Sequence, residues 1–177
     1  MSKAIFLDRD GVINQEVQFV ARPEEFHVLD NSILALKLLM GTDYKLIIIT
    51  NQSGMGYGYY SEEDYQAVTN KMVKIFAEEG IVIDAIYHCP HRYEEKCDCR
   101  KPGTGMLDKA KKEFGIDYER SWFVGDKTSD IKAGENIGVK TILVLTGAGG
   151  KDGRYDVKPD FVAADFLEAV HFITTPK

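Results

Sequence analysis

The sequence is poor in cysteine and has no long apolar run, so it resembles neither a disulfide-stabilised nor a membrane-spanning protein. Among 177 residues there are three cysteines, five prolines and one tryptophan. An odd number of cysteines fits a disulfide framework poorly. No apolar run is long enough to form a membrane span or the core of a signal peptide. We therefore expect a cytoplasmic protein, because structural disulfides are rare in that reducing compartment.

The sequence also has fewer basic than acidic residues. The 22 lysines and arginines are outnumbered by 28 aspartates and glutamates, which gives a net charge of −6. This balance argues against a protein built mainly to hold nucleic acid or an anionic membrane. The hydrophobic content of 44% is ordinary for a globular protein. We expect one domain over residues 1–177, acting as a monomer without a nucleic-acid or membrane partner.

Short apolar runs alternate with helical patterns, which is typical of an α/β domain with a mainly parallel sheet. The predicted strands cover residues 4–7, 45–50, 83–87, 122–124, 140–145 and 161–162. The predicted helices cover residues 33–40, 61–79, 106–114, 129–136 and 165–172. The run KLIIIT at 45–50 is continuously apolar after its lysine, as expected for a strand covered on both faces. Residues 147–159 form a polar, glycine-rich loop that we expect to be mobile.

Polar side chains follow three of the predicted strands. Asp8 and Asp10 come after the first strand, Thr50 and Asn51 end the second, and Asp126 follows the strand that ends in VG. In parallel sheets, ligands bind beyond the carboxyl ends of the strands. We therefore expect these side chains to converge on one functional site.

The stretch LDRDG places two carboxylates two residues apart. If the strand continues through residue 10, Asp8 and Asp10 face the same side. Two carboxylates that close repel unless a proton or a cation neutralises one of them. Mg²⁺ accepts carboxylates together with phosphate oxygens, and a carboxylate can also act as a nucleophile beside an acid-base partner. A solvated turn is the simpler alternative, because D-x-D-G alone is a common pattern.

Two further stretches carry groups suited to phosphate chemistry. TNQSG at residues 50–54 offers a hydroxyl, two amides and backbone donors, although it would serve equally as a polar turn. In VGDKTSD, Asp126 could complete a metal site with the first two aspartates, while Asp130 could cap a helix or orient a neighbour. Lys101, on a loop stiffened by proline, could stabilise developing phosphoryl charge or be an ordinary surface lysine.

All three cysteines lie in the stretch CPHRYEEKCDCRKP. Cys89, His91, Cys97 and Cys99 follow the spacing C-x-H-x5-C-x-C, in which two pairs joined by a short loop can surround one tetrahedral zinc ion. Four protein ligands leave no open position for water, so this site would be structural. A redox pair formed by Cys97 and Cys99 is an alternative. His88 could compete as a ligand, but we prefer His91 because residue 88 is expected to end a strand.

Taken in order, these stretches resemble the haloacid dehalogenase superfamily of phosphotransferases. The resemblance rests on DRDGVIN at 8–14, TNQSG at 50–54, Lys101 and GDKTSD at 125–130. Within the superfamily, C-P-H…C-D-C-R-K-P and RSWFVGDKTSDI are similar to phosphatases of D-glycero-D-manno-heptose 1,7-bisphosphate, with histidinol-phosphate phosphatases as close relatives. The resemblance implies a Rossmann-like sheet with no large cap domain and a zinc-binding loop at residues 89–102.

The resemblance also implies roles for the site residues. Asp8 would attack phosphorus to form an aspartyl-phosphate, and Asp10 would act first as an acid and then as a base. Mg²⁺ would be held by Asp8, the main-chain carbonyl of Asp10 and Asp126, while Thr50 and Lys101 would hold the phosphoryl group. The expected substrate-binding residues are Arg9, Asn51, Gln52, Ser53, Arg100 and Lys127.

Two loops differ from the heptose branch of the superfamily. Residues 15–19 read QEVQF, where relatives usually carry an aspartate and a glycine-tyrosine pair, and residues 56–58 read GYG, where they tend to have alanine-arginine-glycine. Tyrosine cannot replace the charge of an arginine. We expect a magnesium-dependent phosphatase of a small phosphorylated metabolite, foremost the heptose bisphosphate at O7. Histidinol phosphate or another sugar phosphate is the alternative substrate, and a zinc-knuckle binding module on a degenerate phosphatase core is the non-enzymatic alternative.

Overall fold

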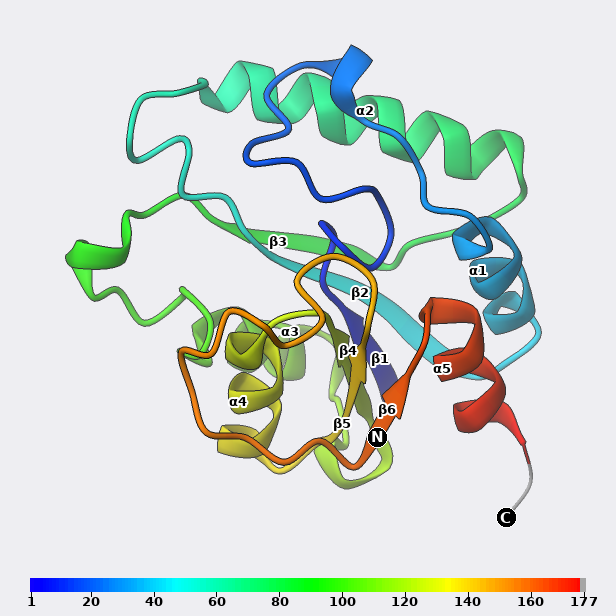
Figure 1. Ribbon diagram of the computed structural model, residues 1–177. Coiled ribbons are helices and arrows are strands. Elements are labelled where there is room, and N and C mark those ends of the chain that lie inside the picture. Colours follow the sequence, from blue (N-terminus) through cyan, green and yellow to red (C-terminus); the bar gives the residue numbers. More distant parts are fainter. Residues whose placement is uncertain (176–177) are drawn as a thin grey trace.

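Six strands form one sheet in the computed structural model, which describes residues 1–175 (Figure 1). Neighbouring strands all run parallel, in the order β3-β2-β1-β4-β5-β6. The strands are β1 Lys3–Leu7, β2 Tyr44–Asn51, β3 Ala85–Cys89, β4 Trp122–Gly125, β5 Lys140–Val144 and β6 Phe161–Ala163. The predicted Rossmann-like α/β fold is confirmed.

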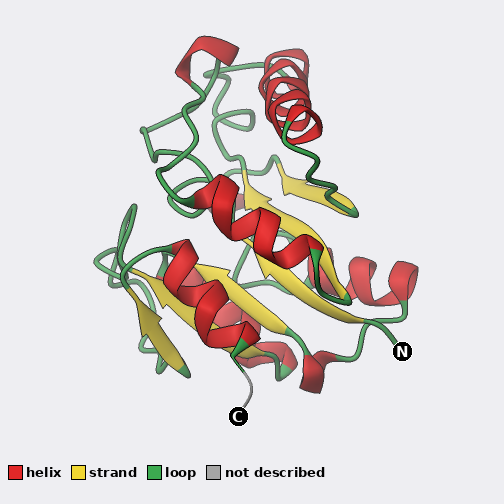
Figure 2. Cartoon of the chain, turned by 90° about the vertical axis from the view of Figure 1, so that its right-hand side faces the viewer, coloured by secondary structure: helices red, strands yellow, loops and turns green. Residues whose placement is uncertain are grey.

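Helices cover both faces of the sheet (Figures 1 and 2). In the described part of the chain they are α1 Ser32–Met40, α2 Glu62–Glu78, α3 Gly105–Phe114, α4 Thr128–Ile137 and α5 Phe166–Thr174. Short 3-10 turns lie at Pro23–Glu25, Tyr93–Glu95 and Tyr118–Arg120. Helices α1, α2 and α5 pack against one face and share one hydrophobic core, while α3 and α4 pack against the other.

The strand β1 illustrates why the central strands are continuously apolar. Ala4 and Phe6 belong to the core under α3 and α4, whereas Ile5 and Leu7 belong to the core under α1, α2 and α5. All four side chains are fully buried. Successive side chains of a strand point to opposite faces, so a strand covered on both sides must be apolar throughout.

The long helix α2 begins where the sequence predicts. The Ser61 hydroxyl accepts a hydrogen bond from the Asp64 backbone N–H at 3.1 Å, and the Asp64 carboxylate accepts one from the Ser61 N–H at 2.8 Å. This reciprocal arrangement is the capping box expected from the sequence. The apolar stripe of the helix, including Val68 and Met72, is buried in the core.

Strand β3 begins two residues later than predicted. The Asp84 carboxylate accepts hydrogen bonds from the Leu46 backbone N–H at 2.8 Å and from Lys45 Nζ at 2.7 Å. These bonds hold the chain at the edge of β2, so pairing starts only with Ala85. The shift makes Cys89 the last residue of the strand, and this first predicted zinc ligand is therefore built into the sheet.

The strand order reverses between β1 and β4, which lie side by side although β2 and β3 come between them in the chain. Such a switch point opens a crevice at the carboxyl ends of the strands, where ligands bind in open parallel sheets. All the predicted catalytic residues lie at or beyond this edge. Within residues 1–175, no helix is both long and apolar enough to cross a membrane.

Candidate active site

Three buried carboxylates meet where β1 and β4 end. Asp8 directly follows β1, Asp126 follows β4, and Asp130 lies in the first turn of α4; one oxygen of each lies within 4.8 Å of the others. Asp10 is absent from this group, since β1 ends at Leu7 and the strand does not continue to residue 10. The condition under which strand alternation would place Asp8 and Asp10 on the same side, a strand that continues to residue 10, is therefore not met.

Lys101 supplies the positive charge nearest to these carboxylates. Its Nζ lies 2.9 Å from Asp8 Oδ1 and 2.7 Å from Asp130 Oδ1, and it donates a hydrogen bond to the Ile49 carbonyl at 2.7 Å. The Asn51 side chain accepts from the Lys101 N–H at 3.1 Å and donates to its carbonyl at 3.3 Å. Lys101 is 3% exposed, so it is not the surface lysine that the sequence left open.

The cluster brings three carboxyl groups around a single contacting lysine, Lys101. Burial, with Asp8 and Asp130 close by, raises the pKa of Asp126 to about 9. Burial also raises the pKa of Asp8, although Lys101 opposes the shift. Asp126 Oδ2 accepts a hydrogen bond from the Ala148 N–H at 2.7 Å, but its buried Oδ1 has no hydrogen-bond partner. A carboxylate oxygen without a hydrogen-bond partner, such as Asp126 Oδ1, is a suitable ligand for a hard divalent cation.

Two glycines leave room for the Asp126 carboxylate. Gly11 has a φ of 86°, and a Cβ atom there would lie 2.3 Å from Asp126 Oδ2. Gly147 has a φ of 59°, and a Cβ atom there would lie 2.2 Å from the same oxygen. Only glycine allows both the left-handed backbone and this close approach.

Asp10 belongs to a second hydrogen-bonded group on the cavity side. Its carboxylate accepts from Arg9 Nη2 at 3.0 Å, from Asn14 Nδ2 at 2.9 Å and from Gln52 Nε2 at 2.9 Å. Burial would raise the pKa of Asp10, but Arg9 and the Asn14 hydrogen bond outweigh it and hold that pKa below the ordinary value. Arg9 is fully buried beneath Asp10. This position differs from the substrate contact that we expected for Arg9.

Gln52 connects the loop after β2 to Asp10. Its Nε2 also donates to Thr50 Oγ1 at 2.8 Å, and its Oε1 accepts from the Tyr60 hydroxyl at 2.6 Å. Every polar atom of the Gln52 side chain is therefore engaged. Thr50, Gln52 and Asp10 form one rigid unit, because none of the three can turn without breaking a buried hydrogen bond.

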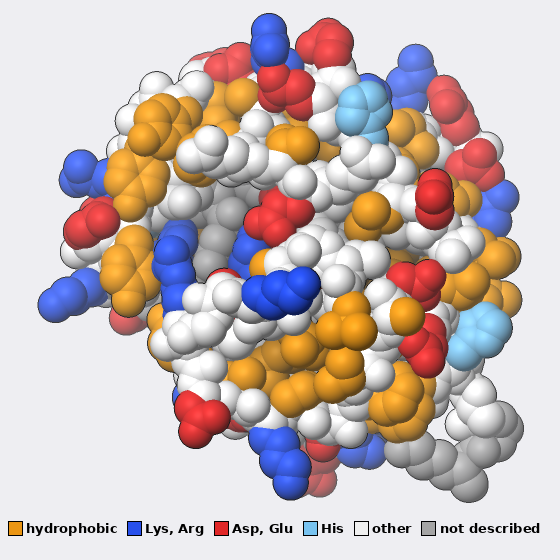
Figure 3. Space-filling model, viewed as in Figure 1, with side chains coloured by type: hydrophobic (Ala, Val, Ile, Leu, Met, Phe, Trp, Pro, Cys, Tyr) orange, Lys and Arg blue, Asp and Glu red, His pale blue; other side chains and the backbone are white. Residues whose placement is uncertain are grey.

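A cavity of about 210 Å³ is lined by Asp10 and Gln52 of the second group and by Lys101, which contacts the carboxylate cluster. Figure 3 shows a hollow on this face, with charged and hydrophobic side chains gathered around it. The predicted site residues on its wall are Asp10, Asn51, Gln52, Ser53, Arg100, Lys101 and Lys127. Glu16 on this wall lies in the stretch 15–19 that differs from the heptose branch. Wall residues that the sequence did not single out include Tyr93, Asp152, Arg154 and Tyr155.

The loops at residues 15–19 and 56–58, whose sequences differ from the heptose branch, lie at different distances from the cavity: the first lines it and the second does not. Residues 16–20 line the cavity, and Glu16 Oε1 pairs with Lys127 Nζ at 2.6 Å. Burial would lower the pKa of Lys127, but Asp8, Asp126 and Glu16 together raise it, so its charge is retained. Tyr57 does not line this cavity, and its hydroxyl donates to Glu94 at 3.0 Å.

The loop at residues 147–159, which we expected only to be polar and mobile, is hydrogen-bonded to the site. The Gly150 N–H donates to the Asp126 carbonyl at 2.7 Å. The Asp152 carboxylate accepts from the Thr128 N–H at 2.8 Å and from the Thr128 hydroxyl at 2.7 Å. Its residues Asp152, Arg154 and Tyr155 thereby become part of the cavity wall. No periodic pattern marks such a loop, and its glycines and isolated charges were the only signal.

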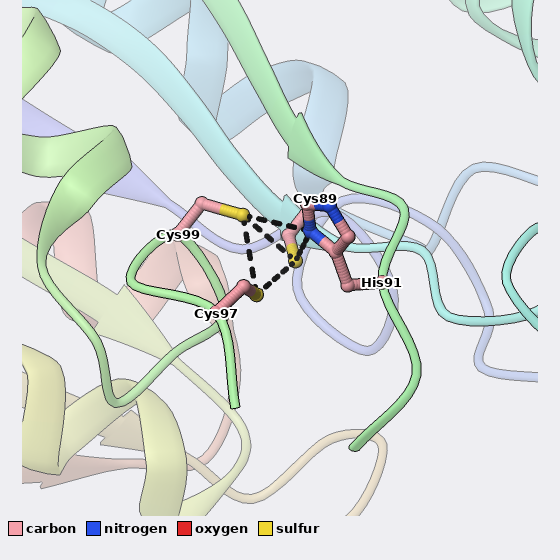
Figure 4. Close-up of side chains that lie close together, drawn as sticks. All are labelled: Cys89, His91, Cys97 and Cys99. Carbon is pink, nitrogen blue, oxygen red and sulfur yellow. Dashed lines mark hydrogen bonds between the residues drawn. The ribbon is translucent and has the colours of Figure 1, made fainter. Parts of the chain in front are cut away.

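The predicted zinc ligands come together as one group (Figure 4). The Sγ atom of Cys89 lies 3.5 Å from that of Cys97 and 3.1 Å from that of Cys99, and His91 Nδ1 lies 3.2 Å from Cys99 Sγ. Sulfurs that share a tetrahedral zinc at bonds of about 2.3 Å lie roughly 3.8 Å apart, so the group needs only a small expansion to hold the ion. His88 is directed away, with Nε2 3.2 Å from Glu62.

Comparison with known proteins identifies similar sequences and structures. The family model described as HAD-hydrolase-like (Hydrolase_like) matches residues 98–169. The chain is 46% identical to the D-glycero-alpha-D-manno-heptose-1,7-bisphosphate 7-phosphatase of Campylobacter jejuni, over 87% of this chain and 88% of that one. It is 41% identical to the D-glycero-beta-D-manno-heptose-1,7-bisphosphate 7-phosphatase of Haemophilus ducreyi, over 97% of this chain and 98% of that one.

A solved structure agrees with these sequence relatives. The D,D-heptose 1,7-bisphosphate phosphatase of B. bronchiseptica, complexed with magnesium and phosphate, superposes with a TM-score of 0.91 at 34% identity. The match covers 97% of each chain. The topology, the carboxylate cluster and the Cys-His group therefore occur in a chain whose similarity to heptose bisphosphate phosphatases extends over nearly its whole length.

Proposed function

Because the chain belongs to the haloacid dehalogenase (HAD)-like hydrolases, we propose that it is a phosphatase that removes the 7-phosphate of D-glycero-D-manno-heptose 1,7-bisphosphate. One observation carries the proposal: three buried carboxylates and Lys101 converge at the switch point of the sheet, and Lys101 lines a cavity whose wall carries further basic side chains. Phosphoryl transfer requires this combination of positioning and charge neutralisation.

In this proposal Asp8 is the nucleophile. Its Oδ1 is held by its contact with Lys101 Nζ and by a hydrogen bond of 2.8 Å from the Arg9 N–H. The other carboxylate oxygen attacks phosphorus and forms an aspartyl-phosphate, while the bond to the sugar oxygen breaks. Lys101 then neutralises charge that develops on the phosphoryl oxygens, and the Thr50 hydroxyl binds one of them.

Asp10 is the proposed acid and base. Its hydrogen bonds to Arg9, Asn14 and Gln52 fix its orientation on the cavity wall, and its lowered pKa suits the later step, in which it takes a proton from the water that hydrolyses the aspartyl-phosphate. For the first step Asp10 must carry a proton to the leaving sugar oxygen. An entering phosphate dianion raises the pKa of a neighbouring carboxyl, which favours that protonation.

The carboxylate cluster fits the Mg²⁺ ion expected from the sequence. Asp8 and Asp126 would hold the ion with their side chains, and Asp10 would contribute its main-chain carbonyl because its carboxylate is engaged elsewhere. A bound Mg²⁺ would neutralise the cluster and the substrate phosphate. The buried, unpartnered Oδ1 of Asp126 supports this assignment.

The Cys-His group would hold a structural zinc, since all four positions are protein atoms. The ion would fix the loop that carries Arg100 and Lys101. We also propose that the protein works as a monomer in the cytoplasm, where a reducing environment keeps its three cysteines from forming disulfides.

The decisive experiment is phosphate release in the presence of Mg²⁺ from heptose 1,7-bisphosphate, histidinol phosphate and a panel of other sugar phosphates. We expect the highest kcat/KM for the bisphosphate. Asp8→Asn should abolish turnover and retain the fold, whereas Asp30→Asn, on the exposed surface, should behave like the wild type. Preference for histidinol phosphate would change the substrate assignment. An active Asp8→Asn variant would refute the covalent mechanism, and a wild type inactive on every ester would favour the non-enzymatic alternative.

A further inference from the structure

Two arginines contact the same aromatic ring at the rim of the cavity. The guanidinium carbon of Arg100 lies 5.8 Å from the centre of the Tyr93 ring, and that of Arg154 lies 5.2 Å from it. All three residues line the cavity. Cation–π contacts of this kind orient the planar guanidinium group without occupying its N–H donors.

The arginines come from loops that are anchored independently. Arg100 lies in the zinc-binding loop, directly after Cys99, and its Nη1 donates to the His91 carbonyl at 3.4 Å. Arg154 lies between two residues that are tied to the start of α4: Asp152 accepts two hydrogen bonds from Thr128, and the Tyr155 N–H donates to the Thr128 hydroxyl at 3.3 Å. The main chain that carries each arginine is therefore held in place by hydrogen bonds.

The other cations of the cavity already have carboxylate partners. Lys101 contacts Asp8 and Asp130, and Lys127 contacts Glu16. Among residues 1–175, neither Arg100 nor Arg154 has a carboxylate within ion-pair distance. Neither guanidinium group is therefore neutralised by a carboxylate, and a guanidinium binds phosphate through paired N–H donors.

We propose that Arg154 binds the non-reacting phosphate of the substrate together with Arg100, and that Tyr93 positions both groups. This inference rests on the proposed function, in which a sugar bisphosphate places one phosphate over Asp8. The second phosphate then lies toward the rim, where the zinc-binding loop and the loop at residues 147–159 meet. Arg154 is thus a specificity residue supplied by a loop outside the catalytic motifs.

The test compares two substrates that differ only in the second phosphate: heptose 1,7-bisphosphate and heptose 7-phosphate. For Arg154→Gln we expect the KM of the bisphosphate to rise about 10- to 100-fold, because a hydrogen bond to a charged group contributes about 1.5–3 kcal/mol. The kcat for the bisphosphate and both constants for the monophosphate should stay within about twofold of the wild type. Arg154→Lys should restore part of the affinity. Lys151→Gln, an exposed position in the same loop, is the matched control.

The outcomes separate this inference from the proposed function. An unchanged KM for the bisphosphate in Arg154→Gln overturns the inference while the phosphatase assignment stands. An equal loss on both substrates also overturns it, because the effect is then on the loop and not on the second phosphate. Wild-type protein that hydrolyses the monophosphate but not the bisphosphate overturns the proposed substrate, and the inference with it. Tyr93→Ala should raise the bisphosphate KM as Arg154→Gln does, and Tyr93→Phe should not.

Discussion

Replacing Lys101 by methionine tests whether this lysine is the main counter-ion of the carboxylate cluster. Methionine preserves much of the side-chain length but removes the ammonium group. The change breaks the contacts of Nζ with Asp8 at 2.9 Å and Asp130 at 2.7 Å, and the hydrogen bond to the Ile49 carbonyl. Two carboxylates are left without their cation in a fully buried environment.

Breaking a buried ion pair on one side costs about 3–5 kcal/mol, and we expect a loss in that range at neutral pH without Mg²⁺. The loss should depend on pH with a defined sign. The pKa of Asp8 is already raised by burial and is held down by Lys101, so removing Lys101 raises it further. A carboxyl group with a raised folded-state pKa contributes stability at low pH and loses it as the pH rises. The difference between Lys101→Met and wild type should therefore grow from about pH 5 to about pH 8.

The assay is urea unfolding in magnesium-free buffer with zinc retained. Lys112→Met, on the exposed face of α3, is the control and should change stability little. Lys101→Met/Asp130→Asn removes one of the stranded charges and should recover about 1–3 kcal/mol without recovering activity. A Lys101→Met variant within about 1 kcal/mol of wild type at neutral pH would resemble the loss of an exposed pair and would refute the reasoning. A difference that shrinks as the pH rises would do the same.

Three further predictions concern the metals and the loop after β2. Metal analysis should find one zinc per chain. Cys97→Ser should lower the melting temperature, kcat and the affinity for the bisphosphate together, because zinc binding contributes to folding. Wild-type protein that is stable without zinc would contradict this prediction. In magnesium-free buffer the free energy of unfolding should fall between about pH 5 and about pH 9, because burial raises the pKa of Asp126 to about 9 and the folded state holds its proton longer. Asp126→Asn should flatten that slope, and a rise of stability over the same range would show that the sign is wrong. Asn51→Ala should lower kcat roughly 10- to 100-fold, because both hydrogen bonds that place the Lys101 backbone are lost; unchanged kcat would mean that Lys101 is placed by other contacts.

The sequence was sufficient to predict the groups at strand ends. Asp8, Thr50 and Asp126 follow short apolar runs typical of buried strands, and parallel strands bring their carboxyl ends to one edge. The cysteines and His91 were also predictable, because their spacing restricts them to one short segment of the chain. These predictions depend on local pattern and on a general rule of topology, and neither requires knowledge of individual side-chain contacts.

Side-chain direction in loops was not predictable. Arg9 sits between two aspartates in the sequence, but the chain turns after Leu7 and buries Arg9 beneath Asp10. Arg154 lies in a loop without periodicity, and its place at the cavity depends on hydrogen bonds between Asp152 and Thr128, which are 24 residues apart. Such contacts are tertiary, and no pattern along the chain encodes them.

Three consecutive residues, Cys99, Arg100 and Lys101, lie in three different environments. Cys99 belongs to the Cys-His group, Arg100 lines the rim beside Tyr93, and Lys101 contacts Asp8. The group also contains Cys89, which ends β3 and is fixed by the sheet. A zinc ion would therefore tie both basic residues to the sheet through one short segment. In the proposed function Arg100 and Lys101 act on different parts of the substrate, so loss of zinc should change KM and kcat together, whereas loss of Arg154 should change KM alone. The zinc would then act on catalysis by positioning, without contacting the substrate.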